Sequence, residues 1–170
     1  GVEGTVPLPS QPPAVPLTQG SQRFDTAAVP GFRLVTAWLP PGAVLDRHVH
    51  DRTNVMVMLR GSFVLGIRGR EINCGRGTVA IEPMGEPHAN HVGSSGAEVI
   101  VVQPDPATPQ SWLPFAASLE SLRSGRSLEG HDAARRLCRE LRVADGVTTL
   151  AREALIVELL GERLKAPKFE

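Results

Sequence analysis

Residues 40–61 read PPGAVLDRHVHDRTNVMVMLRG, a stretch rich in valine and methionine that carries two histidines one residue apart. On a β-strand, side chains two residues apart share a face, so His48 and His50 should point the same way. Counting on by twos from His50 brings one amide and two thioethers to that face: Asn54, Met56 and Met58. The stretch therefore predicts a strand region that collects polar and polarisable groups on one side.

A second group of histidines follows in GTVAIEPMGEPHANHV, residues 77–92. His88 and Asn90 share one face of a strand, whereas strict alternation turns His91 to the other. With the first pair, His88 makes three imidazoles, which could hold one divalent ion such as Zn, Fe, Mn, Ni or Cu. The same residues also suit a polar pocket that binds no metal, and the residue types leave both readings open.

Between about Arg23 and Gln103 the chain consists of short apolar and β-branched runs separated by turn residues. The run from Phe32 to Leu39 alternates with period two, as a strand does. Glycine-containing turns are expected at four places: residues 60–61, 68–69, 75–77 and 93–96. Many closely spaced strands without an intervening helix predict an antiparallel sandwich or barrel.

The flanking segments have a different composition. Residues 1–20 contain five prolines, which remove backbone donors and favour an extended arm. After residue 106 the pattern predicts a short helix that ends near Gly125, an amphipathic helix over residues 131–141, and a longer one from about Thr149 to Leu164. Three segments result: a proline-rich arm (1–20), a β-domain (21–106) and a helical extension (107–170).

Overall composition excludes several classes of protein. Lys and Arg together number 18, as do Asp and Glu, so no excess charge calls for nucleic acid or an anionic membrane. No apolar run approaches the roughly 20 residues that span a bilayer, and no signal peptide opens the sequence. Cys74 and Cys138 are too few for a disulfide framework and are expected to be structural, which favours a cytoplasmic location.

The first histidine stretch resembles the first motif of the cupin family. Gly42, His48, His50 and Gly61 stand at the spacing of that motif, and Asn54 occupies the position at which the family usually has Glu. The two glycines are expected to turn the chain at strand ends. The resemblance implies a small β-barrel or jelly roll with a pocket between its sheets.

The second stretch resembles the second cupin motif. Gly77, Pro83, Gly85 and His88 match it, whereas Val92 stands where the family has Asn. Family members that keep three histidines and lose the Glu sometimes still bind metal, so His48, His50 and His88 remain candidate ligands. Neutral Asn54 is a poor substitute for an anionic ligand.

The helical tail AARRLCRELRVADGVTTLAREALIVELLGERLKA, after such a barrel, resembles the N-terminal sensing half of AraC-type transcription regulators. The resemblance covers about residues 30–164. It implies a small-molecule effector in the barrel and a homodimer formed through the C-terminal helices. DNA would be bound only by a helix-turn-helix domain outside this chain. An apolar stripe that includes Leu155 and Leu159 is the expected dimer interface, although it can also cover the β-domain.

The predicted ligand-binding residues line the barrel interior: Trp38, His48, His50, Asn54, Met56, His88 and Asn90. The first alternative is a metal-dependent cupin enzyme, a dioxygenase or isomerase acting on a small acid or phenol, although no nucleophile–base pair is evident. The second is a barrel packed shut by Met56 and Met58. Glu82 is expected to face solvent, and His131 to lie near a helix start.

Overall fold

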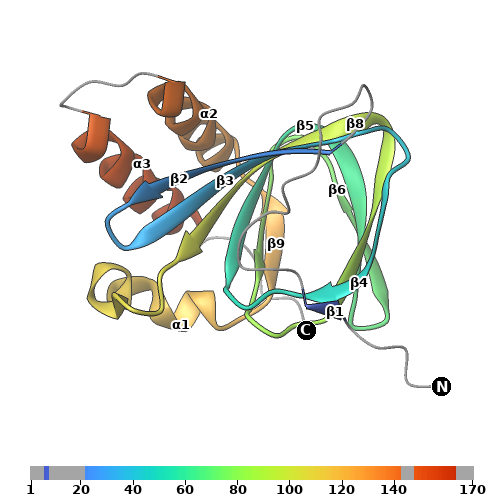
Figure 1. Ribbon diagram of the computed structural model, residues 1–170, viewed down its shortest axis with the longest axis horizontal. Helices are drawn as coiled ribbons and strands as arrows, with labels where there is room; N and C mark the ends of the chain where they lie inside the picture. The colour runs from blue at the N-terminus through green and yellow to red at the C-terminus, as the bar shows by residue number, and fades with distance from the viewer. Residues whose placement is uncertain (1–5, 8–21, 143–147, 164–170) are drawn as a thin grey trace.

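The computed structural model describes residues 6–7, 22–142 and 148–163 (Figure 1). Most of the predicted arm over residues 1–20 lies outside the described residues. The strands are β1 (Val6–Pro7), β2 (Arg23–Val29), β3 (Phe32–Leu39), β4 (Val44–Val49), β5 (Asn54–Ile67), β6 (Arg70–Cys74), β7 (Thr78–Glu82), β8 (His88–Pro104) and β9 (Arg123–Arg126). The helices are α1 (Ala116–Leu119), α2 (Leu128–Arg142) and α3 (Thr148–Arg163). None of the described helices combines the length and apolarity needed to cross a bilayer.

The strands form one antiparallel sheet, apart from the parallel pair of β1 with β4, and this sheet folds over on itself. The two long strands, β5 and β8, pair with each other along their length and belong to both halves. The C-terminal part of β8 pairs with β3, and its N-terminal part pairs with β4. Likewise, β5 pairs first with β7 and then with β6. The architecture is the predicted small antiparallel β-domain with a helical extension.

Two glycines make the bend in the long strands possible. The sequence predicts that Gly61 ends a strand, but β5 continues through it to Ile67, and residues 93–96 likewise lie inside β8. Gly61 has φ +74° and Gly96 has φ +76°, a backbone region that strongly favours glycine. A Cβ on Gly61 would lie 2.0 Å from the carbonyl oxygen of Gly96, so the two strands touch backbone to backbone here.

Replacing Gly61 with alanine is therefore expected to lower the free energy of unfolding by about 2 kcal/mol or more, because backbone strain and a steric clash add. Gly69→Ala is the matched control: Gly69 has φ +71°, but apart from its chain neighbours no atom of the described residues lies within 4 Å of the position that a Cβ would take there. Gly69→Ala should lower the free energy of unfolding by about 1 kcal/mol, because it introduces backbone strain without a clash. Urea unfolding of both variants measures the difference. Equal losses would show that the close strand contact contributes nothing.

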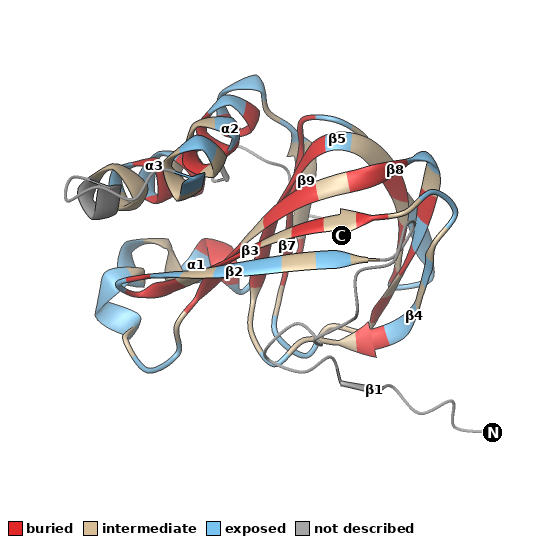
Figure 2. Cartoon of the chain, turned by 45° about the horizontal axis from the view of Figure 1, so that its top comes forward, coloured by how far each residue is buried: buried red, intermediate tan, exposed pale blue. Residues whose placement is uncertain are grey.

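The two faces of the sheet pack into different cores. On the barrel side, Met56 and Met58 of β5 pack with Leu65 and Val99. On the other side, Val55 and Val57 pack against residues of α2 and α3. Neighbouring residues of one strand therefore contact the barrel interior and the helices, and Figure 2 shows buried residues in red both in the strands and in α2 and α3. This arrangement places the helices directly behind the barrel wall.

The helical extension differs from the prediction in one place. A helix was expected to run to near Gly125, but α1 ends at Leu119, and Gly125 lies in β9, which pairs with β7. The extended backbone there adds an edge strand to the sheet. The predicted helices over 131–141 and about 149–164 correspond to α2 and α3, with residue 164 outside the described part.

The apolar stripe of α3 is covered within the chain itself. Leu155, Ile156, Leu159 and Leu160 are all buried, and they belong to the core shared with α2 and the sheet. The sequence predicts that this face packs either against the β-domain or against a second copy of the chain. Because a single chain already buries these side chains, they are not a free dimer interface. Val157, on the opposite face of α3, is 53% exposed.

Candidate functional site

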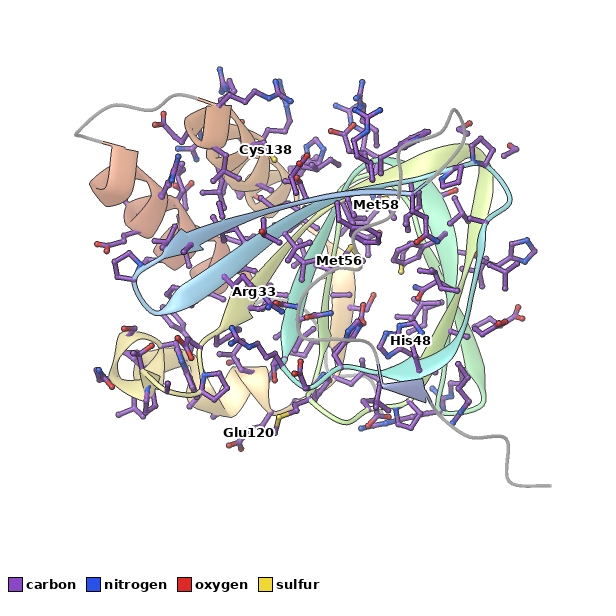
Figure 3. All side chains as sticks on the ribbon, in the orientation of Figure 1. Arg33, His48, Met56, Met58, Glu120 and Cys138 are labelled. Atoms are coloured by element: carbon purple, nitrogen blue, oxygen red, sulfur yellow. The ribbon has the colours of Figure 1, made fainter. Side chains whose placement is uncertain are left out.

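A pocket of about 160 Å³ lies inside the barrel, between the two halves of the sheet. Figure 3 labels Arg33, Met56 and His48, three of its lining residues, which come from β3, β5 and β4. Apolar side chains form most of its wall: Phe24, Val35, Ala37, Leu39, Leu45, Met56, Phe63, Val99 and Val101. Its polar groups form two sets: three imidazoles with a carboxylate, and a chain of Arg33, Gln103 and Asn54.

The three predicted imidazoles meet at one end of this pocket. His48 lies near the end of β4, His50 directly follows that strand, and His88 opens β8. Ring centroids are 4.3 Å apart for His48 and His88, and 4.8 Å apart for His50 and His88. One ligand nitrogen from each of the three lies within 4.8 Å of the others. The period-two spacing and the pairing of His48 with His88 across β4 and β8 produce this convergence.

Backbone carbonyls orient two of these rings. The Nδ1 of His48 is 2.6 Å from the carbonyl oxygen of Asp46, and that of His88 is 2.9 Å from the carbonyl oxygen of Glu86. A carbonyl only accepts, so both Nδ1 atoms carry a proton and donate it. The Nε2 atoms are therefore directed to the centre of the cluster. For His88, Nε2 lies 3.1 Å from Nε2 of His50.

Glu82 completes the cluster, contrary to the expectation that it faces solvent. It is 4% exposed at the end of β7, and its Oε2 lies 2.8 Å from Nε2 of His88 and 3.6 Å from Nε2 of His50. The cause is the register of β5 and β7, which pairs Glu82 directly with Asn54 and so turns it inward. Glu82 lies two residues after the buried Ala80, so the two side chains share a face of β7. The sequence alone does not tell which face of β7 points inward.

The charged groups of the cluster shift one another's pKa values. Burial raises the pKa of Glu82, but the imidazoles of His88, His50 and His48 outweigh it and leave that pKa lowered. Burial lowers the pKa of His88, and the neighbouring carboxylate of Glu82 reverses this, so the net change is a rise. Burial, only partly offset by Glu82, lowers the pKa of His50 to about 4. The site is therefore built around an ionised carboxylate.

The second polar set of the pocket is a chain of hydrogen bonds. Arg33 Nε donates to Oε1 of Gln103 over 2.6 Å, and Gln103 Nε2 donates to Oδ1 of Asn54 over 2.7 Å. The amide oxygen of Asn54 is thus already engaged. The pKa of Arg33 is lowered, chiefly by burial, yet a guanidinium stays charged at neutral pH. Arg33 therefore brings a fixed, partly desolvated positive charge to the pocket.

The structure brings most of the predicted site residues together, with one exception. His48, His50, Asn54, Met56, His88 and Asn90 all line the pocket. Trp38 does not: it lines a separate hollow of about 650 Å³ between the sheet and α2. Both faces of β3 are covered, so alternation alone does not identify the inward one. Met58 belongs to the barrel core, and His91, predicted to lie on the other face of the strand from His88, is exposed.

His131 and the cysteines lie outside the pocket. His131, near the start of α2, is buried and donates from Nε2 to the carbonyl oxygen of Leu59 over 3.1 Å, which attaches the helix to β5. Burial raises the pKa of Cys74 to about 12 and that of Cys138 to about 11, so neither is a reactive thiolate at neutral pH. This fits the structural role predicted for both.

Two larger hollows open beside α2 but lack the chemistry of the barrel pocket. The hollow of about 650 Å³ contains Trp38, and another of about 620 Å³ is lined by arginines that include Arg76, Arg135 and Arg139. Neither hollow gathers a group of metal-ligating side chains among the described residues. The barrel pocket is thus the candidate site because the three imidazoles converge in it, although it has a smaller volume than either hollow.

The imidazole cluster is chemically suited to a divalent cation. Three nitrogen donors with two rings oriented by backbone carbonyls are typical of sites for Zn, Fe, Mn or Ni. Metal-binding histidines usually donate their second ring N–H to such a carbonyl. The residues present fit a metal ion on these grounds.

Three solved structures share part of this fold. A variant of oxalate decarboxylase from Bacillus subtilis is 29% identical over 45% of this chain and 22% of its own, with a TM-score of 0.41. KdgF from Halomonas sp. is 20% identical over 54% and 84% of the two chains, with a TM-score of 0.46. A protein of unknown function from Rhizobium leguminosarum bv. viciae is 21% identical over 50% and 82%, with a TM-score of 0.47. The chain spans only about a fifth of the decarboxylase.

No curated protein sequence matches the chain. A family model described as the AraC-like ligand binding domain matches residues 34–160. This match begins in β3, includes all three imidazoles and Glu82, and ends in α3, so it covers both the pocket and the helices behind it. The chain therefore belongs to the family of AraC-like ligand-binding domains, built on the cupin fold.

Proposed function

We propose that this chain senses a small-molecule effector for an AraC-type transcription regulator, with the effector bound in the barrel pocket. The observation that carries the proposal is the pocket itself, which combines an apolar wall with two charged groups, the carboxylate of Glu82 and the guanidinium of Arg33. Its volume of about 160 Å³ is below the usual 300–1,000 Å³ of drug-sized sites, so the effector is small. A divalent ion held by His48, His50 and His88 would act as part of that site.

The barrel wall offers a direct route from the pocket to the helices. In β5, Asn54 and Met56 line the pocket, while Val55 and Val57 pack in the core shared with α2 and α3. The hydrogen bond from His131 to the carbonyl of Leu59 attaches α2 to the same strand. An effector that prefers one position of β5 would therefore bias the packing of the helices, which is the requirement for coupling.

We propose that the effector carries one acidic group, which binds Arg33. The Nε of Arg33 is used by Gln103, and the terminal guanidinium nitrogens make no hydrogen bond that is recorded among the described residues. A charged hydrogen bond in such a setting contributes about 1.5–3 kcal/mol. The small, mainly apolar space beside it favours a compact aromatic or aliphatic carboxylate.

Calorimetric titration with small carboxylates and their amides, such as benzoate and benzamide, tests this. The acid is expected to bind more tightly than its amide, and Arg33→Gln should weaken acid binding by about 10-fold or more. Arg52→Gln, which removes a nearby arginine that does not line the pocket, serves as control. Equal binding of acid and amide would contradict the proposed acidic group, and an effect of Arg52→Gln alone would place it elsewhere.

The regulator would act as a homodimer in the cytoplasm and bind DNA through a helix-turn-helix domain outside these residues. Because Leu155 and Leu159 are buried within the chain, we propose that the dimer uses the exposed side of α3, which includes Val157. Light scattering at micromolar concentration should then give a dimer that Val157→Asp converts to a folded monomer. A wild-type monomer at that concentration would contradict this interface.

A metal-dependent enzyme is the second candidate, favoured by the buried carboxylate of Glu82 beside three imidazoles. A bound ion would supply Lewis-acid chemistry to a small acid or phenol, and the chain would supply the ligands and exclude water. Conversion of a small acid by metal-loaded protein, lost in the metal-free form, would establish this function. Binding without turnover supports the sensor.

A further inference from the structure

We infer that Glu82 supplies the anionic ligand of a metal site that it forms with His48, His50 and His88. This inference rests on the proposed function in taking the barrel pocket as the binding site, and it adds a ligand that the histidine spacing does not include. Three neutral imidazoles leave both charges of a divalent cation uncompensated. A carboxylate in the same cluster neutralises one of them.

Position 54 does not offer that carboxylate. Asn54 is neutral, and its one oxygen accepts the hydrogen bond from Gln103 over 2.7 Å. Glu82 is its direct partner across the antiparallel pair of β5 and β7. Paired side chains on one face of a sheet have Cβ atoms about 5 Å apart, so a carboxylate at either position reaches the same space. The anionic group therefore stands on the neighbouring strand.

The donor atoms are already spaced as ligands of one ion. Glu82 Oε2 and the Nε2 atoms of His88 and His50 form a triangle with sides of 2.8, 3.1 and 3.6 Å. Metal–ligand distances of about 2.0–2.2 Å place neighbouring ligands roughly 2.8–3.6 Å apart in octahedral or tetrahedral geometry. The triangle thus has the size of one face of a coordination shell.

The protein environment also gives Glu82 little else to bind. The carboxylate is 6% exposed, and the ion-pair partners recorded for it in the described part of the chain are imidazoles, with no lysine or arginine among them. The Nδ1 protons of His48 and His88 go to backbone carbonyls, so Nε2 is the atom that each ring has left to bind an ion. Without an ion, the contact of 2.8 Å between Glu82 and His88 requires a proton on the imidazole, because a carboxylate only accepts; a divalent cation would take the place of that proton and hold both groups.

The test is Co²⁺ binding to chelator-stripped protein, followed by the visible absorption of the ion and by elemental stoichiometry. Wild type should bind one Co²⁺ per chain, and Glu82→Gln should weaken the affinity by about 10- to 100-fold or more and change the absorption bands. Glu86→Gln is the matched control: it makes the same chemical change two residues from His88, but its carboxylate pairs with Arg68. It should bind Co²⁺ as wild type does.

A double variant, Glu82→Asn with Asn54→Glu, moves the carboxylate to the paired position and should recover most of the affinity that Glu82→Asn loses. If Glu82→Gln does not fold by circular dichroism, Glu82→Asp, which retracts the carboxylate, replaces it. Full-affinity binding by folded Glu82→Gln or Glu82→Asn, which both lack the carboxylate, would overturn the inference while leaving a three-histidine site intact. A wild type that binds no Co²⁺ would also overturn it, without affecting effector binding, which the carboxylate titration measures separately.

Discussion

Replacing Leu159 with aspartate is expected to unfold the domain rather than to separate a dimer. Leu159 is fully buried in the core formed by α2, α3 and the helix-facing side of the sheet. Truncating such a leucine costs about 2–5 kcal/mol, and burying a carboxylate in its place adds several more. The sum approaches the whole stability of an ordinary domain, about 5–15 kcal/mol. Thermal unfolding followed by circular dichroism should show no cooperative transition.

Val157→Asp is the control on the same helix, because Val157 is 53% exposed and contributes little to the core. This variant should keep the wild-type unfolding transition whether or not it alters association. If Leu159→Asp instead remained folded and only lost self-association, α3 would not be part of the folded core. The packing of the helices against β5 could then not change in response to an effector in the barrel.

Replacing His88 with leucine in metal-free protein is expected to lower the free energy of unfolding by about 3–5 kcal/mol. The variant leaves the carboxylate of Glu82 buried without its nearest partner, which lies 2.8 Å away in the wild type. Removing one member of a buried pair costs this much because an uncompensated charge remains in the interior. Urea unfolding in the presence of a chelator measures the loss.

The double variant with Glu82→Gln separates this charge effect from a general loss of packing. Because the uncompensated carboxylate is gone, it should be more stable than His88→Leu alone by at least about 1 kcal/mol. Double-mutant analysis then gives a coupling energy for the pair. A double variant no more stable than His88→Leu would show that Glu82 and His88 do not interact as the structure indicates.

Local geometry explains which parts of the site could be predicted from the sequence. His48 and His50 share a face because strand periodicity needs no knowledge of neighbouring strands. The position of Glu82 depends on how β7 pairs with β5, two strands separated by β6, and no local pattern encodes that register. The prediction that Trp38 lines the pocket is wrong for a related reason. Both faces of β3 are covered, so alternation does not identify the face that lines the pocket.

The same distinction applies to the fold. Glycine at positions 61 and 96 marks a change of direction, but a glycine that bends a continuing strand and one that ends it look alike in sequence. The stripe on α3 predicts a helix with a buried face, yet not the surface that buries it. In this chain the sheet and α2 cover that face. Leu155 and Leu159, which were expected at a dimer interface, are therefore buried in the core of a single chain.

The most direct test of the account is a nuclear magnetic resonance titration of the chain with small carboxylates, compared with a Met56→Trp variant whose larger side chain fills the pocket of about 160 Å³. If the pocket binds the effector and the helices respond, shift changes should be largest at pocket residues of β3, β5 and β8, should extend to amides of α2 and α3, and should all be absent from the filled variant. Shift changes that persist in Met56→Trp, or that are confined to the arginine-lined hollow beside α2, would contradict the account.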